Sequence, residues 1–271
     1  MEPWTRVESN PSQSRCELQG HDFELAAGFL MTEGVVDDST DIREISYSSG
    51  RTDPADRLPQ DTLELNDLVL PYQPEGNVVR VELEPDVSVS LANLERNFYT
   101  TSSCGICGKA SLLALRTVCP PRSANTFRIA AKVLLSLPEK LRAAQDVFDR
   151  TGGLHASGVF DQGGDLYATR EDVGRHNAVD KLLGAEFLAD QTPLRDRLLL
   201  LSGRASFELL QKALMGGFPM VASVGAPSSL AVQVAREFDI TLVGFLRRNT
   251  FNVYHGAERI FGDPFLGKEL I

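Results

Sequence analysis

The segment TSSCGICGKAS holds the residues best suited to chemistry, because two cysteines, Cys104 and Cys107, are separated by two residues. A helical pattern, KASLLALRTV, follows at once. Both sulfurs are therefore expected near the positive end of a helix dipole, which stabilises a thiolate, and Lys109 adds a further positive charge. Such a thiolate is a nucleophile near neutral pH. It can attack a persulfide sulfur and hold it as its own persulfide.

Three other interpretations of this cysteine pair compete with thiol chemistry. A zinc site needs four ligands, so the pair would have to recruit Cys16, Cys119 or a histidine at irregular spacing. A thioredoxin-like site belongs after the first strand of a βαβ unit, and here the pair follows an alternating, β-like region. A purely structural role suits buried thiols better than a loop lined by glycines. We therefore expect thiol chemistry and no structural metal.

Three serine- and arginine-containing loops form the second signal. They are SGRAS (202–206), SVGAPSS (223–229) and FLRRNT (245–250). Each loop follows, or includes the end of, an apolar segment that predicts a parallel strand. The carboxyl ends of parallel strands lie along one edge of a sheet, so the three loops should share that edge, or rim. Ser202 and its neighbours offer hydroxyls and backbone N–H groups at a helix start, while Arg204, Arg247 and Arg248 supply positive charge. Each loop alone is explained by helix capping. Together they favour an anionic ligand.

A third group of polar residues surrounds the segments GGLHASGVF and REDVGRHNAVDK. It comprises His155, Asp172, Arg175, His176, Asn177, Asp180 and Lys181. Some of these have structural explanations, since Glu171 or Asp172 can cap a helix and Asp180 can pair with a basic side chain. His155 and His176, beside a glycine turn and the expected anion rim, are candidates for ligand binding.

Periodicity along the chain indicates a β-rich part followed by an α/β part. Residues 1–20 are polar and aperiodic, 22–34 predict an amphipathic helix, and 42–91 alternate as short antiparallel strands. We expect a poorly ordered or divergent N-terminus (1–20), a small β-rich domain with one helix (21–103) and an α/β domain (104–271).

The α/β part reads as a series of helices and strands. A helical region is predicted within 124–147, LHASGVF and LYATR as a β-hairpin, and EDVGRHNAVDKLLGAEFL as a helix. Continuous apolar strands at 198–201, 220–223 and 240–246 then alternate with the helices FELLQKALM and SSLAVQVAREF. This alternation predicts a parallel sheet with both faces covered.

Composition and charge exclude several classes of protein. The chain of 271 residues is 42% apolar and 24% charged, and no apolar run approaches the roughly 20 residues of a membrane span. A net charge of −10 and a pI near 5.0 argue against binding to nucleic acid backbones. The first residues show no secretory signal, so we expect a cytoplasmic protein whose cysteines stay reduced.

With these motifs in place, the chain resembles the FdhD family, the formate dehydrogenase accessory sulfurtransferases. The resemblance runs through HDFELAAGFLMTEG, TSSCGICGKAS, TGGLHASGVF, REDVGRHNAVDKLLG, SGRASFELLQKALMGG and TLVGFLRRNTFNVY, which leaves out little after residue 20. Family members usually have an N-terminal strand pair, and residues 1–18 do not show that pattern.

The resemblance implies a function for each of the two sites. A cysteine desulfurase would load sulfur onto the pair, with Cys104 as persulfide carrier and Cys107 assisting. The acceptor would be the bis(guanine dinucleotide) molybdenum or tungsten cofactor of formate dehydrogenase, with GDP as an analogue of its nucleotide ends. The family's cofactor-contacting loop falls on Phe245, Leu246, Arg247, Arg248, Asn249 and Thr250.

The resemblance also bears on assembly, fold and the competing functions. It implies a homodimer whose larger domain is similar in fold to cytidine deaminases. The deaminase zinc signature is missing, because His155-Ala156-Ser157 offers no glutamate and no PCxxC follows. This disfavours a zinc hydrolase. A second alternative is a non-catalytic cofactor-binding chaperone of formate dehydrogenase with a structural metal at the cysteines.

Overall fold

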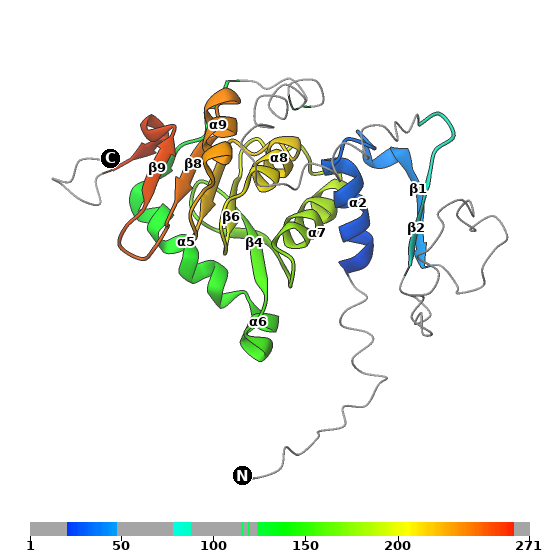
Figure 1. Cartoon of the computed structure of the whole chain (residues 1–271), viewed down its shortest axis with the longest axis horizontal. Coiled ribbons are helices and arrows are strands. Elements are labelled where there is room, and N and C mark those ends of the chain that lie inside the picture. The colour runs from blue at the N-terminus through cyan, green and yellow to red at the C-terminus, as the bar shows by residue number, and fades with distance from the viewer. Residues whose placement is uncertain (1–20, 48–77, 88–114, 116–118, 120–123, 263–271) are drawn as a thin grey trace, which may run out of the picture.

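The computed structural model describes residues 21–47, 78–87, 115, 119 and 124–262, and its centre is a six-stranded sheet of order β5-β4-β6-β7-β8-β9 (Figure 1). The strands are β4 (His155–Phe160), β5 (Leu166–Asp172), β6 (Leu198–Leu201), β7 (Met220–Ser223), β8 (Thr241–Gly244) and β9 (Asn252–His255). This mixed α/β architecture confirms the predicted fold class.

The sheet is parallel only in its middle. Strands β6, β7 and β8 run parallel, whereas β4 is antiparallel to β6 and β9 is antiparallel to β8. The predicted hairpin is confirmed as β4 and β5, and it extends the same sheet. Strand β9 was not predicted, and the strand expected over 240–246 ends at Gly244 because Phe245 adopts a left-handed backbone with φ of 52°.

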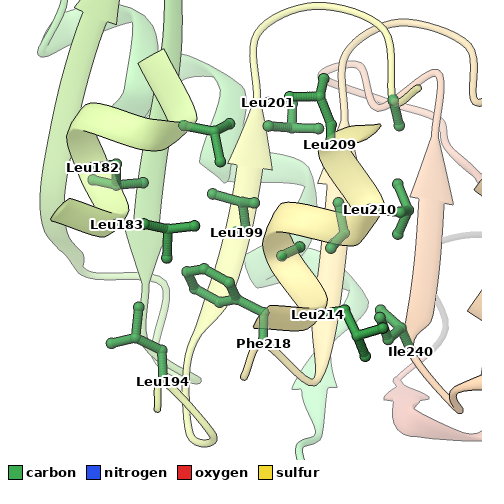
Figure 2. Packing of buried hydrophobic residues seen from close by; sticks show 14 of the residues in the cluster. Leu182, Leu183, Leu194, Leu199, Leu201, Leu209, Leu210, Leu214, Phe218 and Ile240 are labelled. Carbon is green, nitrogen blue, oxygen red and sulfur yellow. The ribbon is translucent and has the colours of Figure 1, made fainter. Parts of the chain in front are cut away.

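Helices cover both faces of the sheet. Helices α7 (Arg175–Leu188), α8 (Phe207–Met215) and α9 (Ser229–Glu237) lie on one face and α5 (Ala131–Ala143) on the other (Figure 1). Alternate strand residues supply the two cores, so Leu199 packs with α7 and α8 while Leu198 and Leu200 pack with α5. Figure 2 shows Leu183 of α7 beside Leu199 of β6, and Leu214 of α8 beside Ile240.

An N-terminal unit packs against α7. Helix α2 (Asp22–Thr32) is followed by a 3-10 turn, η2 (Ser39–Asp41), and by β1 (Ile42–Tyr47), which pairs antiparallel with β2 (Val79–Leu83). The helix predicted over 22–34 is confirmed as α2, and two of the antiparallel strands predicted within 42–91 are confirmed as β1 and β2, whereas 48–77 and 88–91 lie outside the described residues. A buried network ties α2 to the larger part: Lys212 Nζ lies 2.9 Å from Asp180 Oδ1 and 3.2 Å from Glu33 Oε1, and Thr32 Oγ1 donates to Asp180 Oδ1 at 2.9 Å.

The region predicted as helical within 124–147 begins differently. Residues 124–130 are not helical and end in the short strand β3 (Ile129–Ala130), which pairs with β10 (Ile260–Phe261). Asn125 holds this segment in place, because its Nδ2 donates to the carbonyls of Pro219 and Asp239 at 2.8 and 2.9 Å. Helix α6 (Asp146–Thr151) and the turn η5 (Ala257–Arg259) complete the elements.

None of the helices in the described part of the chain has both the length and the apolar character needed to cross a membrane. The proposed domain boundary between residues 103 and 104 and the N-terminal segment 1–20 lie outside the described residues. The division into domains therefore stays a prediction.

Candidate functional site

One edge of the six-stranded sheet gathers the polar segments singled out from the sequence. Strands β6, β7 and β8 end there, β5 ends there, and β4 and β9 begin there, as the registers Ser157↔Leu201, His155↔Asp172 and Gly244↔Asn252 require. We call this edge the rim. It comprises residues 155, 172–176, 202–206, 223–229 and 245–250.

Main-chain hydrogen bonds join the three predicted loops to one another. Ala205 N donates to Ala226 O at 3.2 Å and Gly225 N donates to Gly203 O at 2.8 Å. Phe245 N in turn donates to Gly225 O at 3.0 Å. The expectation that the loops share one rim is thus confirmed.

The close approach of the first two loops requires a glycine. A Cβ at Gly225 would lie 2.8 Å from Arg204 Cα and 2.8 Å from Gly203 O, well inside van der Waals contact. The absence of a side chain at residue 225 therefore lets the two loop backbones pack side by side.

The three rim arginines are exposed, and two of them are tethered. Arg247 donates from Nη1 to Val224 O, which crosses from one loop to the next. Arg248 Nε lies 3.1 Å from Glu139 Oε1 of α5, in a pair whose side chains are 78% and 60% exposed. Arg204 is exposed beside them. The rim therefore presents positive charge to solvent.

The loop after β8 presents both an aromatic ring and polar groups. Phe245 is 41% exposed, and its left-handed backbone is unusual for a bulky residue. Leu246 is fully buried in the core, so it can contact a ligand only through its main chain. Asn249 and Thr250 are exposed, and Thr250 O accepts the Arg247 N–H at 2.8 Å.

His155 and Ser202 meet where β4 begins and β6 ends. Ser202 Oγ accepts the Ala156 N–H at 2.8 Å, and Ser202 N donates to Ala156 O at 3.0 Å. The His155 ring lies against the first loop, because a Cβ at Gly203 would be 3.2 Å from His155 Nδ1. The structure thus brings these two predicted residues together.

His176, the second residue of α7, reaches the same loop. Its Nε2 is 3.3 Å from Ser206 Oγ and 4.0 Å from Glu208 Oε2. Burial lowers the pKa of His176, and the charges of Arg175 and Lys212 lower it further against the opposing effect of Glu208. The imidazole is therefore neutral near pH 7, so it can donate one hydrogen bond and accept another.

Two helix starts at the rim have no side-chain cap. The N-cap residues Gly174 of α7 and Ser206 of α8 make no side-chain capping bond, and the Ser206 hydroxyl meets His176 instead. Ser228 does cap α9, accepting the Ala231 N–H at 3.1 Å, so its hydroxyl is already engaged. The SGRAS loop before α8 is therefore a better candidate for binding an anion than the SVGAPSS loop before α9, since uncapped helix N-termini attract negative charge.

The two acidic candidates for capping α7 have other roles. Glu171 accepts the N–H groups of Val147 and Phe148, each at 2.9 Å, and so caps α6. Asp172 accepts the Gly174 N–H at 2.7 Å and pairs with Lys181. Asp180 pairs with a lysine as expected, namely Lys212.

The catalytic candidates Cys104 and Cys107 lie outside the described residues. Cys119 packs partly buried against the core, which suits a structural residue. Among the residues that the structure describes, no group of three or more His, Cys, Asp or Glu side chains is arranged to hold a metal ion.

Sequence reasoning missed several neighbours of the rim residues. Ser206 and Glu208 meet His176, and Glu139 meets Arg248, across separations in sequence of 30 or more residues. Ser206 carried a weak signal, since a serine directly before FELLQKALM is a standard N-cap residue. Glu139 carried none.

Comparison with known proteins agrees with the motifs. The model of the FdhD/NarQ family matches residues 7–261. Two relatives named "Sulfur carrier protein FdhD" cover 94% of this chain: one from Streptomyces coelicolor is 48% identical and matched over 85% of its length, and one from Mycobacterium tuberculosis is 47% identical and matched over 88%.

A solved structure shares the fold. It is a crystal structure from Desulfotalea psychrophila, provisionally described as a formate dehydrogenase accessory protein, with a TM-score of 0.61 at 22% identity, covering 89% of this chain and 80% of its own. With a family model spanning nearly the whole sequence and relatives close to half identical, the chain belongs to the FdhD/NarQ family.

Proposed function

We propose that this protein is a cytoplasmic sulfur carrier that passes persulfide sulfur from a cysteine desulfurase to the bis(guanine dinucleotide) cofactor of formate dehydrogenase, which holds molybdenum or tungsten. The observation that carries the proposal is the rim, where exposed arginines, two uncapped helix starts and an exposed aromatic ring form one surface. Such a surface suits a ligand with a phosphate and a flat base. The names of the relatives support the sulfur-carrier part.

In the proposed loading step, the Cys104 thiolate attacks the outer sulfur of the desulfurase persulfide. The new bond joins Cys104 to that sulfur, the old S–S bond breaks, and the desulfurase thiolate leaves. In delivery, the Cys107 thiolate attacks Cys104 Sγ and displaces HS⁻ toward the metal, which leaves a Cys104–Cys107 disulfide. The cysteine pair supplies the two electrons, and a cellular dithiol must then reduce the disulfide.

The rim residues are proposed to hold the cofactor by its nucleotide ends. Arg204, Arg247 and Arg248 would neutralise phosphate charge, and the exposed ring of Phe245 would stack on guanine. Ser202, His155 and His176 would donate hydrogen bonds to phosphate oxygens, while the Leu246 main chain, Asn249 and Thr250 would contact the base or sugar. We also propose a homodimer, as the family resemblance implies.

Intact mass tests sulfur loading. The protein incubated with a cysteine desulfurase and cysteine should gain about 32 Da, the mass of one sulfur, and Cys104→Ala should abolish the gain. Cys16→Ala and Cys119→Ala serve as controls that keep it. If the wild type gains no sulfur but binds stoichiometric zinc, the alternative of a chaperone with a structural metal replaces the carrier.

Calorimetry tests the ligand. GDP or GTP should bind in preference to ATP, and replacing Arg247 and Arg248 together by alanine should cost about 1.5 to 3 kcal/mol for each charge-assisted bond that is lost. Equal affinities for GDP and ATP, or an unchanged affinity in the double variant, would remove the guanine nucleotide assignment.

A further inference from the structure

Asp172, the last residue of β5, lies at the rim and contacts the segment that leads into α7. Its Oδ1 accepts the Gly174 N–H at 2.7 Å and its Oδ2 lies 2.6 Å from Lys181 Nζ. Its backbone is also the register partner of His155 on β4. The carboxylate therefore contacts both the turn before α7 and the interior of that helix.

The Asp172–Lys181 pair is largely removed from water. Only 15% of the Asp172 side chain and 11% of the Lys181 side chain are exposed. Removing one partner of such a pair leaves an uncompensated charge, so the pair constrains how β5 and α7 meet. Asp180, next to Lys181 in α7, pairs with Lys212 of α8. Two adjacent charged residues of α7 therefore bind different elements, Lys181 to β5 and Asp180 to α8.

Arg175 and His176 are the first two residues of α7 and directly follow this turn. In the described part of the chain, the buried Nε of Arg175 has no hydrogen-bond partner. The His176 imidazole meets Ser206 Oγ at 3.3 Å and Glu208 at 4.0 Å. The positions of both residues therefore depend on how the helix starts.

We propose that Asp172 is a positioning residue of the rim: with Lys181 it fixes the turn before α7 and thereby holds Arg175 and His176 at the ligand edge. The proposal deepens the assignment of the rim as a nucleotide site and rests on it for the identity of the ligand. It does not make Asp172 a ligand-contacting residue.

The first test measures the pKa of His176 by NMR titration in wild type and Asp172→Ala, with the signal assigned by comparison with His176→Gln. Loosening the turn would admit water to the imidazole, so its lowered pKa should rise toward the ordinary value. Loss of the Asp172 charge alone would lower the pKa further, because an anion that favours the imidazolium is gone. The charged groups around His176, namely Arg175, Glu208 and Lys212, keep their charges in this variant.

The matched control is Glu171→Gln. It removes a carboxylate from the adjacent residue, but that carboxylate caps α6, and its loss should leave His176 unchanged. Asp172→Asn retains an oxygen for the Gly174 N–H but loses the ion pair with Lys181. The turn should therefore loosen less than in Asp172→Ala, and the pKa of His176 should rise by a smaller amount. Asp172→Asn also serves as the test if Asp172→Ala fails to fold. An unchanged or lowered pKa of His176 in the folded variant would overturn the proposal.

The second test measures GDP affinity. Asp172→Asn should weaken binding roughly tenfold, whereas Glu171→Gln should stay within about twofold of wild type. If wild-type protein binds no GDP, the proposed function fails, and the NMR titration still decides the role of Asp172. If Asp172→Asn binds GDP like wild type while Arg247→Ala does not, the rim is a nucleotide site that Asp172 does not position.

Discussion

Gly28 of α2 and Gly184 of α7 form a reciprocal contact between two helix backbones. A Cβ at Gly28 would lie 1.8 Å from Asp180 O, and a Cβ at Gly184 would lie 1.8 Å from Glu24 O. The obstacle in each case is main chain, which cannot rotate away. The N-terminal helix therefore meets α7 at a distance that only glycine permits.

Gly28→Ala should destabilise the protein by about 3 kcal/mol, because α2 would have to move away from α7 and from the buried Lys212 network. This destabilisation is opposite in sign to the effect of helix propensity, because alanine favours a helix by about 1 kcal/mol over glycine. Chemical denaturation measures the effect. Gly153→Ala is the control, because a Cβ there meets nothing closer than 4.0 Å and should change stability little.

If Gly28→Ala and Gly153→Ala were equally stable, α2 and α7 would have to separate without cost in free energy, and their close crossing would not stabilise the fold.

The amphipathic pattern of Phe23, Ala26, Ala27 and Leu30 was sufficient to predict α2. It could not reveal the role of Gly28, because the partner glycine lies 156 residues later and the clash exists only after both helices have formed.

The ion pair between Glu24 and Arg170 should make stability depend on pH. Arg170 donates from Nε at 2.5 Å and from Nη2 at 2.7 Å to the two carboxylate oxygens. Burial raises the pKa of Glu24, but the hydrogen bond and charge of Arg170, with help from His21, outweigh it and hold the pKa below its ordinary value. The folded state therefore favours the ionised form.

The stabilisation from this carboxylate is fully present above its unfolded pKa, about 4.3, and is lost as pH falls through the lower folded value. Glu24→Gln should cost about 1 to 3 kcal/mol at pH 7, and the difference from wild type should shrink below pH 4.5. Thermal denaturation over pH 3 to 7 measures this. Glu44→Gln, at an exposed carboxylate of β1, is the control; a constant Glu24→Gln difference across this range would contradict the linkage.

The exposed ring of Phe245 should be dispensable for folding but needed for the ligand. Phe245→Gly relieves the strain of φ at 52° and removes a ring that is 41% exposed, so stability should stay within about 1 kcal/mol of wild type. Loss of a stacking ring should weaken GDP binding by about 1 to 3 kcal/mol. Calorimetry and thermal denaturation on the same samples separate the two effects.

Asp190→Gly is the matched control for that experiment. Asp190 also has a left-handed backbone, with φ of 56°, but it follows α7 at the end of the sheet opposite the rim. Its replacement by glycine should leave GDP binding unchanged. Equal losses of affinity in both variants would point to a general effect of backbone freedom rather than to a stacking ring.

The rim itself was predictable because it follows from local patterns and one rule. The runs LLLL and MVAS and the helices between them carry strong signals, and the carboxyl ends of parallel strands must share an edge. The ion pairs that hold the rim were not predictable. Arg248 of the loop after β8 pairs with Glu139 of α5, and Asp172 at the end of β5 pairs with Lys181 of α7. Such contacts depend on how elements pack rather than on the sequence near each residue.

The proposed sulfur and nucleotide sites should be separable by mutation. The loops of the rim are held by hydrogen bonds to one another, from Ala205 to Ala226 and from Phe245 to Gly225. Cys104→Ala should therefore still bind GDP, because the rim arginines and helix starts do not depend on that sulfur. Conversely, Arg247→Ala should still gain about 32 Da from a desulfurase, since the thiolate chemistry does not involve that guanidinium. In cells this variant should fail to activate formate dehydrogenase, because a loaded persulfide without a docked cofactor has no acceptor.

Native mass spectrometry, calorimetry and a cellular activity assay on both variants test the separation. A folded Cys104→Ala protein that no longer binds GDP would show that the cysteine pair belongs to the nucleotide pocket or holds a metal, and the carrier mechanism would then have to be replaced.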